Sequence, residues 1–390
     1  MQSLTKLRKE QLTHSRFTHL QCAECGRTYD KNEIHFYCNH NDCNSPLLAV
    51  YDLENAVDWK NLKNRPANMW RYQELLPVQL KRNILTLGEG MTPLLPTRNL
   101  ARKLGIKHLF IKDESINPTG SFKARGLAMA VSRAKELGIE KCTIPTAGNA
   151  GSAMSAYCAK GGIQAFVFMP KNTPELFKVE CRFFGAQLTQ VEGTISDCAQ
   201  VMKIENEVHQ AYDVSTLKEP YRLEGKKTMG YEIAEQLGWE TPDVIVYPTG
   251  GGTGLIGIWK AFREMLEMGW IDTIKTRMVA VQVEGCHPIV KAFKEGRHSA
   301  EAYSNPQPTI ANGLRVPHAF GHRLILQTIH ESKGKAVTIS DAAMLEGIQE
   351  IANLEGLFVA PEGAAVWMAL KQLRESNWVR EADKVVLLNT

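Results

Sequence analysis

A single lysine stands in an unusual place in the segment "NPTGSFKARG", residues 117–126. Residues 117–120 are typical of a turn, and Ser121 is expected to cap the helix that follows. Lys123 then falls in the first turn, where the helix dipole opposes a positive charge. The position predicts an amine that loses its proton readily, as a nucleophile or Schiff-base former must. The alternative is an ordinary solvated surface lysine.

A second segment, "PTAGNAGSA" at residues 145–153, follows a predicted strand and opens a helix rich in small residues. Open α/β sheets bind ligands at the carboxyl ends of their strands. Backbone N–H groups at such a helix start can bind a carboxylate, and Asn149 could add a side-chain amide. The alternative is a Gly-Asn turn without a ligand.

A third segment, "PTGGGTGLIG" at residues 248–257, places a glycine cluster between a strand and a helix. Glycines let the backbone approach a phosphate closely and direct several N–H groups at it. Gly252, Gly254 and Gly257 also fit the pattern G-x-G-x-x-G, with Glu284 ending the next strand. A dinucleotide site is therefore an open alternative, although this fingerprint normally begins a domain.

Four of the nine cysteines are close together in the sequence, at Cys22, Cys25, Cys38 and Cys43. The first two form a C-x2-C pair, and four thiolates predict a closed, structural zinc site. His40 could replace Cys38 or Cys43, and four unliganded thiols in a reducing cytosol are the other alternative. The segment is expected to be short and poor in strands, and the metal would hold it together. The remaining cysteines are predicted to lie in the core: Cys142, Cys158, Cys181, Cys198 and Cys286.

Short apolar runs alternate with longer amphipathic ones from residue 104 onward, which predicts parallel sheets covered by helices on both faces. The expected fold class is α/β, with two parallel α/β domains and a cleft between them. The predicted segments are a cysteine-rich, zinc-ribbon-like 1–50, a connection 51–103, a smaller domain 104–237 and a larger domain 238–390.

The composition excludes several classes of protein. A net charge of +4 over 390 residues gives little support to a nucleic-acid or membrane partner. The first residues contain no apolar signal region, and no run of about 18 apolar residues occurs. A cytoplasmic protein acting on a small molecule is the expectation, and nucleic-acid binding through the cysteine cluster is disfavoured because no Lys/Arg stripe lies beside it.

Three segments in this order resemble threonine synthase and its relatives, the fold-type II (tryptophan synthase β-like) enzymes that use pyridoxal 5′-phosphate. They are "LGEGMTPLLP", "KDESINPTGSFKARG" and "YRLEGKKTMGYEIAEQLGW". The resemblance covers nearly the whole chain, including a cysteine-rich N-terminal segment typical of one branch. It implies pyridoxal phosphate as cofactor and, as in many relatives, a homodimer.

The resemblance also implies roles for single residues. Lys123 would bind the cofactor aldehyde, Asn149 its phenolic oxygen, and Thr390 its ring nitrogen. Its phosphate would lie against Gly250, Gly251, Gly252, Thr253 and Gly254. The substrate carboxylate would be bound by Thr146, Ala147, Gly148, Asn149 and Ala150, and a departing phosphate by Arg222 with Lys226 or Lys218.

The implied reaction converts O-phospho-L-homoserine and water to L-threonine and phosphate. The chain departs from the family pattern at Ala124, Gly251 and Thr253, and in "STLKEP". A dehydratase or β-replacement synthase acting on serine, threonine or a phosphorylated or sulfonated relative is therefore a close alternative. A nicotinamide-dependent oxidoreductase that uses the same glycine loop is a distant one.

Overall fold

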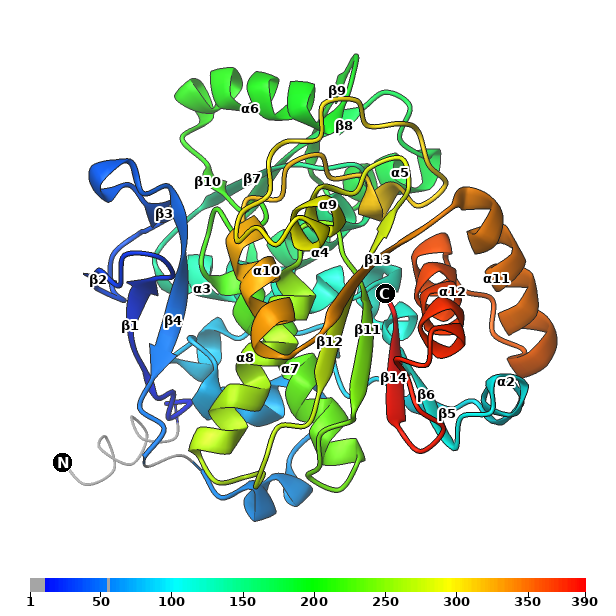
Figure 1. Ribbon diagram of the computed structural model, residues 1–390. Helices are drawn as coiled ribbons and strands as arrows, with labels where there is room; N and C mark the ends of the chain where they lie inside the picture. Colours follow the sequence, from blue (N-terminus) through cyan, green and yellow to red (C-terminus); the bar gives the residue numbers. More distant parts are fainter. Residues whose placement is uncertain (1–10, 55–56) are drawn as a thin grey trace. The chain divides into compact units, whose positions relative to one another are not determined.

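The computed structural model describes residues 11–54 and 57–390, and Figure 1 shows their helices and strands. The chain forms two compact units. The first consists of Met1–Met91 and Asn117–Thr228, and the second of Thr92–Ile116 and Met229–Thr390. Each unit therefore combines stretches that are distant in the sequence. None of the helices in the described ranges is long and apolar enough to cross a membrane.

The cysteine-rich segment forms a small antiparallel sheet with the strand order β2-β1-β4-β3. The expectation of a strand-poor segment is wrong, because inward-facing residues of the longer strands, such as Phe17, Leu20, Leu47 and Ala49, are buried and favour strand pairing. The strands are β1 (Phe17–Cys22), β2 (Thr28–Tyr29), β3 (Tyr37–Cys38) and β4 (Ser45–Tyr51), with the short 3-10 helix η1 (His40–Asp42) between β3 and β4.

The first part of the connection that follows contains three short 3-10 helices. Two begin at side-chain caps: Asp58 accepts the N–H of Lys60, and Asn68 accepts the N–H of Trp70. The elements are η2 (Trp59–Asn64), η3 (Met69–Leu75) and η4 (Lys81–Asn83).

The rest of the first unit is built on a parallel sheet with the order β10-β7-β8-β9. Helices α4 and α6 both pack on β7 and β8, and they lie on opposite sides of the sheet (Figure 1). This explains why β8 reads as a continuous apolar run. The elements are α3 (Lys123–Glu136), β7 (Lys141–Pro145), α4 (Asn149–Gly161), β8 (Gln164–Pro170), α5 (Glu175–Phe183), β9 (Gln187–Val191), α6 (Ile195–His209) and β10 (Tyr212–Asp213), preceded by η6 (Pro118–Gly120).

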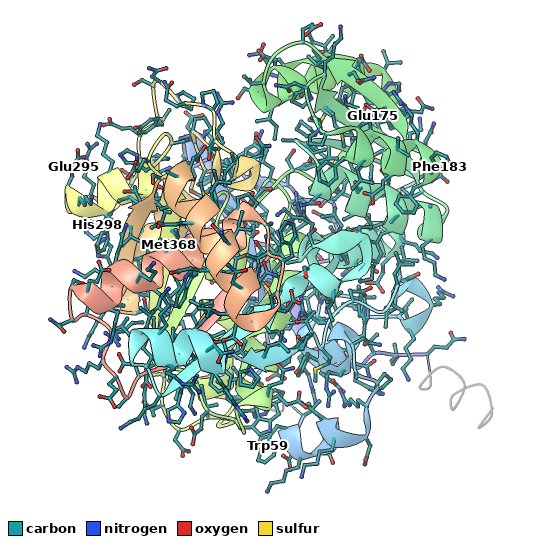
Figure 2. The ribbon with its side chains drawn as sticks, turned by 90° about the vertical axis from the view of Figure 1, so that its right-hand side faces the viewer. Trp59, Glu175, Phe183, Glu295, His298 and Met368 are labelled. Atoms are coloured by element: carbon teal, nitrogen blue, oxygen red, sulfur yellow. The ribbon has the colours of Figure 1, made fainter. Side chains whose placement is uncertain are left out.

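The second unit contains a six-stranded sheet with the order β13-β12-β11-β14-β6-β5, in which only β5 is antiparallel to its neighbour. Helices α2, α11 and α12 pack together on one side (Figure 1). Met368 of α12, labelled in Figure 2, belongs to the core beneath them. The strands are β5 (Leu94–Pro96), β6 (His108–Asp113), β11 (Val244–Pro248), β12 (Arg277–Val283), β13 (Lys335–Ile339) and β14 (Lys384–Asn389).

The helices of this unit complete the expected α/β alternation. They are α2 (Arg98–Leu104), α8 (Thr253–Glu267), α9 (Pro288–Lys294), α10 (His322–Glu331), α11 (Asp341–Glu355) and α12 (Pro361–Glu375), with η5 (Glu114–Ile116) and η7 (Asn312–Leu314). Helix α7 (Tyr221–Gln236) contributes residues to both units.

The α/β fold class is confirmed, but the units do not follow the predicted segment limits. Strand β6 falls in the predicted smaller domain 104–237, yet it pairs with β14 along its full length, from His108 with Lys384 to Asp113 with Asn389. Backbone pairing therefore places residues 92–116 with the C-terminal sheet.

Candidate active site

Lys123 is the first residue of α3 and is half-buried. Its Nζ lies 3.7 Å from the ring centroid of Phe122. Phe122 precedes Lys123 but already has helical backbone angles (φ −59°, ψ −9°) and makes no side-chain cap. Ser121 is extended (φ −162°, ψ 163°), and its Oγ accepts the backbone N–H of Lys123 at 3.4 Å, so the predicted cap at Ser121 is confirmed. The lysine therefore lies at the positive end of a helix, beside the ring of Phe122.

Two glycines hold α3 against the start of α7. A Cβ atom on Gly225 would lie 2.0 Å from the carbonyl oxygen of Arg125, and one on Gly126 would lie 3.0 Å from both the carbonyl oxygen of Arg222 and Cε of Lys226. Neither glycine was recognised from the sequence, although an isolated glycine inside a helical pattern signals a close approach. Their absent side chains bring the segment of Lys123 next to that of Arg222.

Three cations were predicted around a substrate phosphate, and the structure brings two of them close to Lys123. Arg222 is 1% exposed, and its Nη1 donates to the carbonyl of Val214 at 2.7 Å. Its Nε has no hydrogen-bond partner among the described residues. Lys226 is also 1% exposed, with Nζ 4.6 Å from the centroid of the Phe122 ring. Lys218 is only half-buried.

Burial is the main cause of the pKa shifts of Arg222 and Lys226. It lowers the pKa of Arg222, while Glu219 and Asp213 act in the opposite direction. Burial, then Arg222 and then Lys123, hold the pKa of Lys226 well below its ordinary value. A buried guanidinium with an unsatisfied N–H and a second nitrogen base nearby are suited to bind an oxyanion.

The second loop lies between β7 and α4. Thr146 is buried, and its Oγ1 accepts the N–H of Gly148 at 3.2 Å. Gly148 has φ +147°, and a Cβ atom there would lie 2.9 Å from the ring of Phe177, so glycine is required. Asn149 begins α4, and Ala147 is exposed. The N–H groups of Thr146, Gly148 and Gly151 already have acceptors in the protein, which leaves those of Asn149 and Ala150 in the first helical turn as the ones suited to bind an anion.

The glycine loop between β11 and α8 is a tight cradle in which side chains do not fit. A Cβ atom on Gly250 would lie 2.3 Å from the carbonyl oxygen of Gly313, and one on Gly254 would lie 1.9 Å from Oη of Tyr247. Gly252 precedes α8 with φ +76°, and its Cβ atom would meet Ile325 at 2.3 Å. Thr253 is the first residue of α8, and Gly251 is half-buried. The N–H groups of this first helical turn have no intrahelical acceptors, which fits a phosphate.

Thr390 lies at the same edge of the sheet as this loop. It follows β14, which pairs in parallel with β11 through Val246 and Leu387. Continuing that pairing by three residues places Thr390 level with Thr249, the residue before Gly250. The second unit therefore brings the predicted phosphate loop and Thr390 to neighbouring strand ends.

The segment "LGEGMTP" is tied to two of these elements in the first unit. The N–H of Gly90 donates to Oδ1 of Asn117 at 3.1 Å, close to Lys123 in the sequence. Glu89 is fully buried and accepts hydrogen bonds from Nε1 of Trp70 at 2.7 Å and from Oη of Tyr157 in α4 at 2.6 Å. Burial, followed by the charge of Glu89, raises the pKa of Tyr157. Glu89 therefore anchors α4, a role that its sequence gave no sign of.

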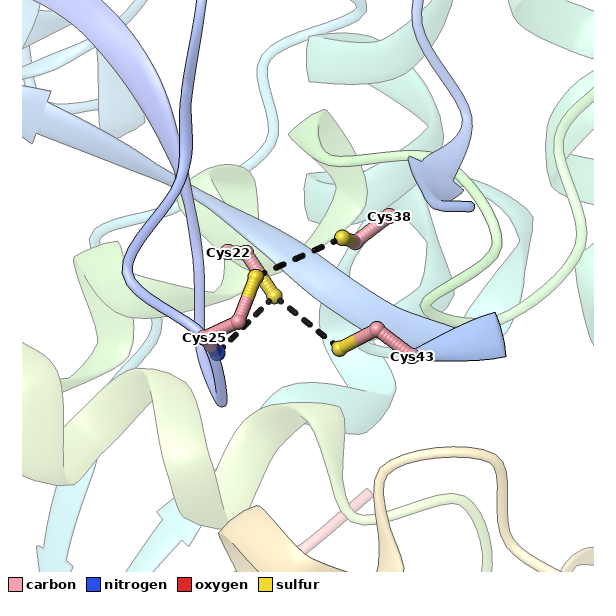
Figure 3. Close-up of side chains that lie close together, drawn as sticks. All are labelled: Cys22, Cys25, Cys38 and Cys43. Atoms are coloured by element: carbon pink, nitrogen blue, oxygen red, sulfur yellow. Dashed lines mark hydrogen bonds between the residues drawn. The ribbon is translucent and has the colours of Figure 1, made fainter. Parts of the chain in front are cut away.

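The four cysteines Cys22, Cys25, Cys38 and Cys43 form one group, with all Sγ atoms within 4.8 Å of one another. Figure 3 shows the sulfur atoms turned toward each other, with Cys22–Cys43 and Cys25–Cys38 Sγ separations of 3.6 Å. Oη of Tyr29 donates to Sγ of Cys38 at 3.1 Å. Nδ1 of His40 lies 2.6 Å from Nη1 of Arg27 instead, so the structure does not place His40 among the four cysteines.

Comparisons with known proteins give the family. A model described as "Pyridoxal-phosphate dependent enzyme" matches residues 85–390. Threonine synthases from Methanocaldococcus jannaschii and Methanosarcina acetivorans are each 36% identical to this chain over 374 residues, which are 95% of this chain and 91% of theirs. A threonine synthase from Halalkalibacterium halodurans is 32% identical, covering 83% of this chain and 89% of that protein.

Solved structures share the fold at lower identity. Maize serine racemase superposes with a TM-score of 0.67 at 21% identity, covering 77% of this chain and 87% of that one. Threonine deaminase isoform 2 from Solanum lycopersicum superposes with a TM-score of 0.67 at 19% identity, covering 86% of this chain and 90% of that one. The chain therefore belongs to the pyridoxal-phosphate dependent enzymes of fold type II and is a threonine synthase-like member of that family.

Proposed function

We propose that this protein converts O-phospho-L-homoserine and water to L-threonine and phosphate. The observation that carries the proposal is the 36% identity to threonine synthases over almost the entire chain. The buried pair Arg222 and Lys226 next to the segment of Lys123 supports it, because a phosphorylated substrate needs a cationic group near the reacting amine.

Pyridoxal phosphate fits the residues that the structure offers. The cradle of Gly250, Gly251, Gly252, Thr253 and Gly254 would hold its phosphate through backbone N–H groups. Cβ atoms added to Gly250, Gly252 or Gly254 would collide with neighbouring atoms. Asn149 would donate to its phenolic oxygen and Thr390 would face its ring nitrogen. When bound, the cofactor supplies an aldehyde that combines with amines and a ring that withdraws electron density from the substrate α-carbon.

The protein side chains would then bind the substrate and move its protons. Lys123 would hold the cofactor, and its freed amine would take the proton from Cα and later one from Cβ of the substrate. Thr146, Ala147, Gly148 and Ala150 would hold the substrate carboxylate at the start of α4. Arg222, with Lys226 and the more exposed Lys218, would bind the phosphate group and stabilise it as it leaves Cγ.

The cysteine cluster is proposed to hold one structural zinc ion through Cys22, Cys25, Cys38 and Cys43. Four thiolates at mutual distances suited to tetrahedral coordination are the donor set that zinc prefers. Such thiolates persist in a reducing compartment, so we also infer a cytoplasmic protein, and the resemblance to dimeric relatives suggests a homodimer.

Peptide mapping after borohydride reduction tests the lysine. Lys226 is the matched control, because its Nζ also lies beside the Phe122 ring. The expected result is a pyridoxyl label on Lys123 alone, a yellow wild-type protein, and loss of both the colour and about 1000-fold of the activity in Lys123→Ala. A label on Lys226, or a yellow Lys123→Ala protein, would contradict the assignment.

Product analysis separates the proposed reaction from its alternative. O-phospho-L-homoserine should yield equal amounts of phosphate and threonine. Formation of a 2-oxo acid from serine or threonine, without threonine synthesis, would instead identify a dehydratase. Membership in this family argues against the nicotinamide-dependent oxidoreductase, which would be colourless and bind NAD.

A further inference from the structure

Glu219 is a buried carboxylate at the beginning of α7 that the sequence gave no reason to select. It is 0% exposed. Its two oxygens accept the backbone N–H groups of Tyr221 and Arg222, each at 2.8 Å. The carboxylate thus fixes the first turn of the helix that carries Arg222 and Lys226, and it complements the helix dipole there.

Charged and titratable groups face Glu219 from two elements. From α7 these are Tyr221, Arg222 and Lys226, and from β10 it is Tyr212, whose pKa is raised by burial and then by Glu219. Burial raises the pKa of Glu219 to about 7, although Arg222, the two N–H groups and Lys226 act in the opposite direction. Asp213 lies beside Arg222 and Lys218. Glu219 therefore interacts electrostatically with both Arg222 and Lys226.

We propose that Glu219 is a positioning residue for the anion bound by Arg222, and that it takes up one proton from solvent when a dianion binds. The inference rests on the proposed function, because it needs Arg222 as the phosphate ligand. The physical reason is repulsion: a dianion beside a buried carboxylate makes its ionised form costly. Protonation removes that repulsion, and the second oxygen continues to accept an N–H from α7.

The sign of the pH dependence follows from this linkage. The complex holds one proton more than the free protein, so anion affinity falls as pH rises above the range in which free Glu219 is protonated. Above about pH 7 the dissociation constant should rise by up to roughly tenfold per pH unit. Below that range the affinity should level off, because Glu219 already carries its proton.

Calorimetry of sulfate binding to the holoenzyme measures this effect directly. Sulfate is the suitable probe because it stays a dianion between pH 6 and 9, whereas inorganic phosphate titrates itself. Titrations in buffers of different ionisation enthalpy give the number of protons taken up. Wild type should take up close to one proton per sulfate near pH 8, and Glu219→Gln should take up close to none and bind sulfate equally at all pH values.

Two variants serve as controls. Asp197→Asn removes another helix-capping carboxylate, one that is exposed in the capping box of α6, and should keep the wild-type proton uptake. Uptake that persists in Glu219→Gln but disappears in Lys226→Gln would assign the proton to Lys226 and overturn the inference. Wild-type binding without proton uptake would overturn it without any variant.

The proposed function is tested separately by Arg222→Gln. Loss of sulfate binding in that variant, together with threonine formation by wild type, would support Arg222 as the anion ligand whatever the result for Glu219. Sulfate binding that ignores Arg222→Gln would contradict the phosphate role of Arg222 and, with it, the inference about Glu219.

Discussion

Tyr51 and Glu224 are joined by a buried hydrogen bond of 2.7 Å, although 173 residues separate them in the sequence. Tyr51 ends β4 of the cysteine-rich sheet, and Glu224 lies in α7, two residues after Arg222. Nζ of Lys227 lies 2.6 Å from the same carboxylate and 4.0 Å from the ring centroid of Tyr51. The small sheet is thus attached to the helix that carries the proposed phosphate ligands.

Removing the hydroxyl of this pair should destabilise the protein. Tyr51→Phe leaves a buried carboxylate with one partner fewer, which costs about 2 kcal/mol because the acceptor is charged. Urea unfolding followed by circular dichroism measures the loss. Tyr303→Phe is the control, since that hydroxyl is partly exposed and 3.4 Å from His287. Equal effects of the two substitutions would contradict a special role of the Tyr51–Glu224 bond.

The buried ion pair between Lys112 and Glu232 should be sensitive to the loss of one partner. The atoms are 2.8 Å apart and both side chains are 0% exposed. Lys112→Met leaves Glu232 buried without this cation and should cost about 3–5 kcal/mol in unfolding free energy. The double variant Lys112→Met/Glu232→Leu should recover much of that loss. A double variant no more stable than the single one would refute this explanation.

A side chain added inside the glycine cradle should weaken binding of the cofactor phosphate. Gly252→Ala adds a Cβ atom 2.3 Å from Ile325 at φ +76° and should weaken pyridoxal phosphate binding at least about tenfold, measured by titrating the visible absorbance. Gly269→Ala is the matched control, with φ +67° and no atom within 4 Å of the added Cβ. It should cost about 1 kcal/mol of stability and leave cofactor binding unchanged.

Glu219 should make stability depend on pH in a defined direction. Its pKa is raised from 4.5 to about 7 by burial, so between these values the folded protein binds more protons than the unfolded chain. Its contribution to stability is therefore present below about pH 4.5 and is lost as pH rises through 7, by a few kcal/mol. Unfolding curves from pH 5 to 8 should show this loss in wild type. In Glu219→Gln the decline should be smaller, and equal slopes would disprove the linkage.

The cysteine cluster should bind about one zinc ion per chain. Atomic emission spectroscopy measures this zinc content. Cys25→Ser removes one thiolate of the group and should release the ion and destabilise the small sheet. Cys198→Ser is the control, because Cys198 lies in α6 and is buried in a hydrophobic core cluster that contains none of the four cysteines. Unchanged zinc content in Cys25→Ser would contradict the proposed ligand set.

Much of the local structure could be predicted because it depends on residues close together in the sequence. The continuous apolar run "QAFVFMP" coincides with β8, as the expected alternation of apolar and amphipathic segments implies, and the helix of Lys123 follows the turn residues. The four cysteines were recognised by spacing, and their sulfur atoms do lie together. Ser121 was expected to cap this helix, and its Oγ does accept the backbone N–H of Lys123.

Other features could be decided only by tertiary contacts. The roles of Gly126 and Gly225 arise from atoms that approach them across α3 and α7. Glu219 accepts N–H groups that are near it in the sequence, but its complete burial depends on the fold around it. The unit limits likewise depended on β6 pairing with β14, which lies more than 250 residues further along the chain. The sequence alone therefore indicated the α/β alternation and selected the lysine and the loops of the proposed site. Burial and close packing decided which charges face one another, because the cost of a charge depends on what surrounds it in space.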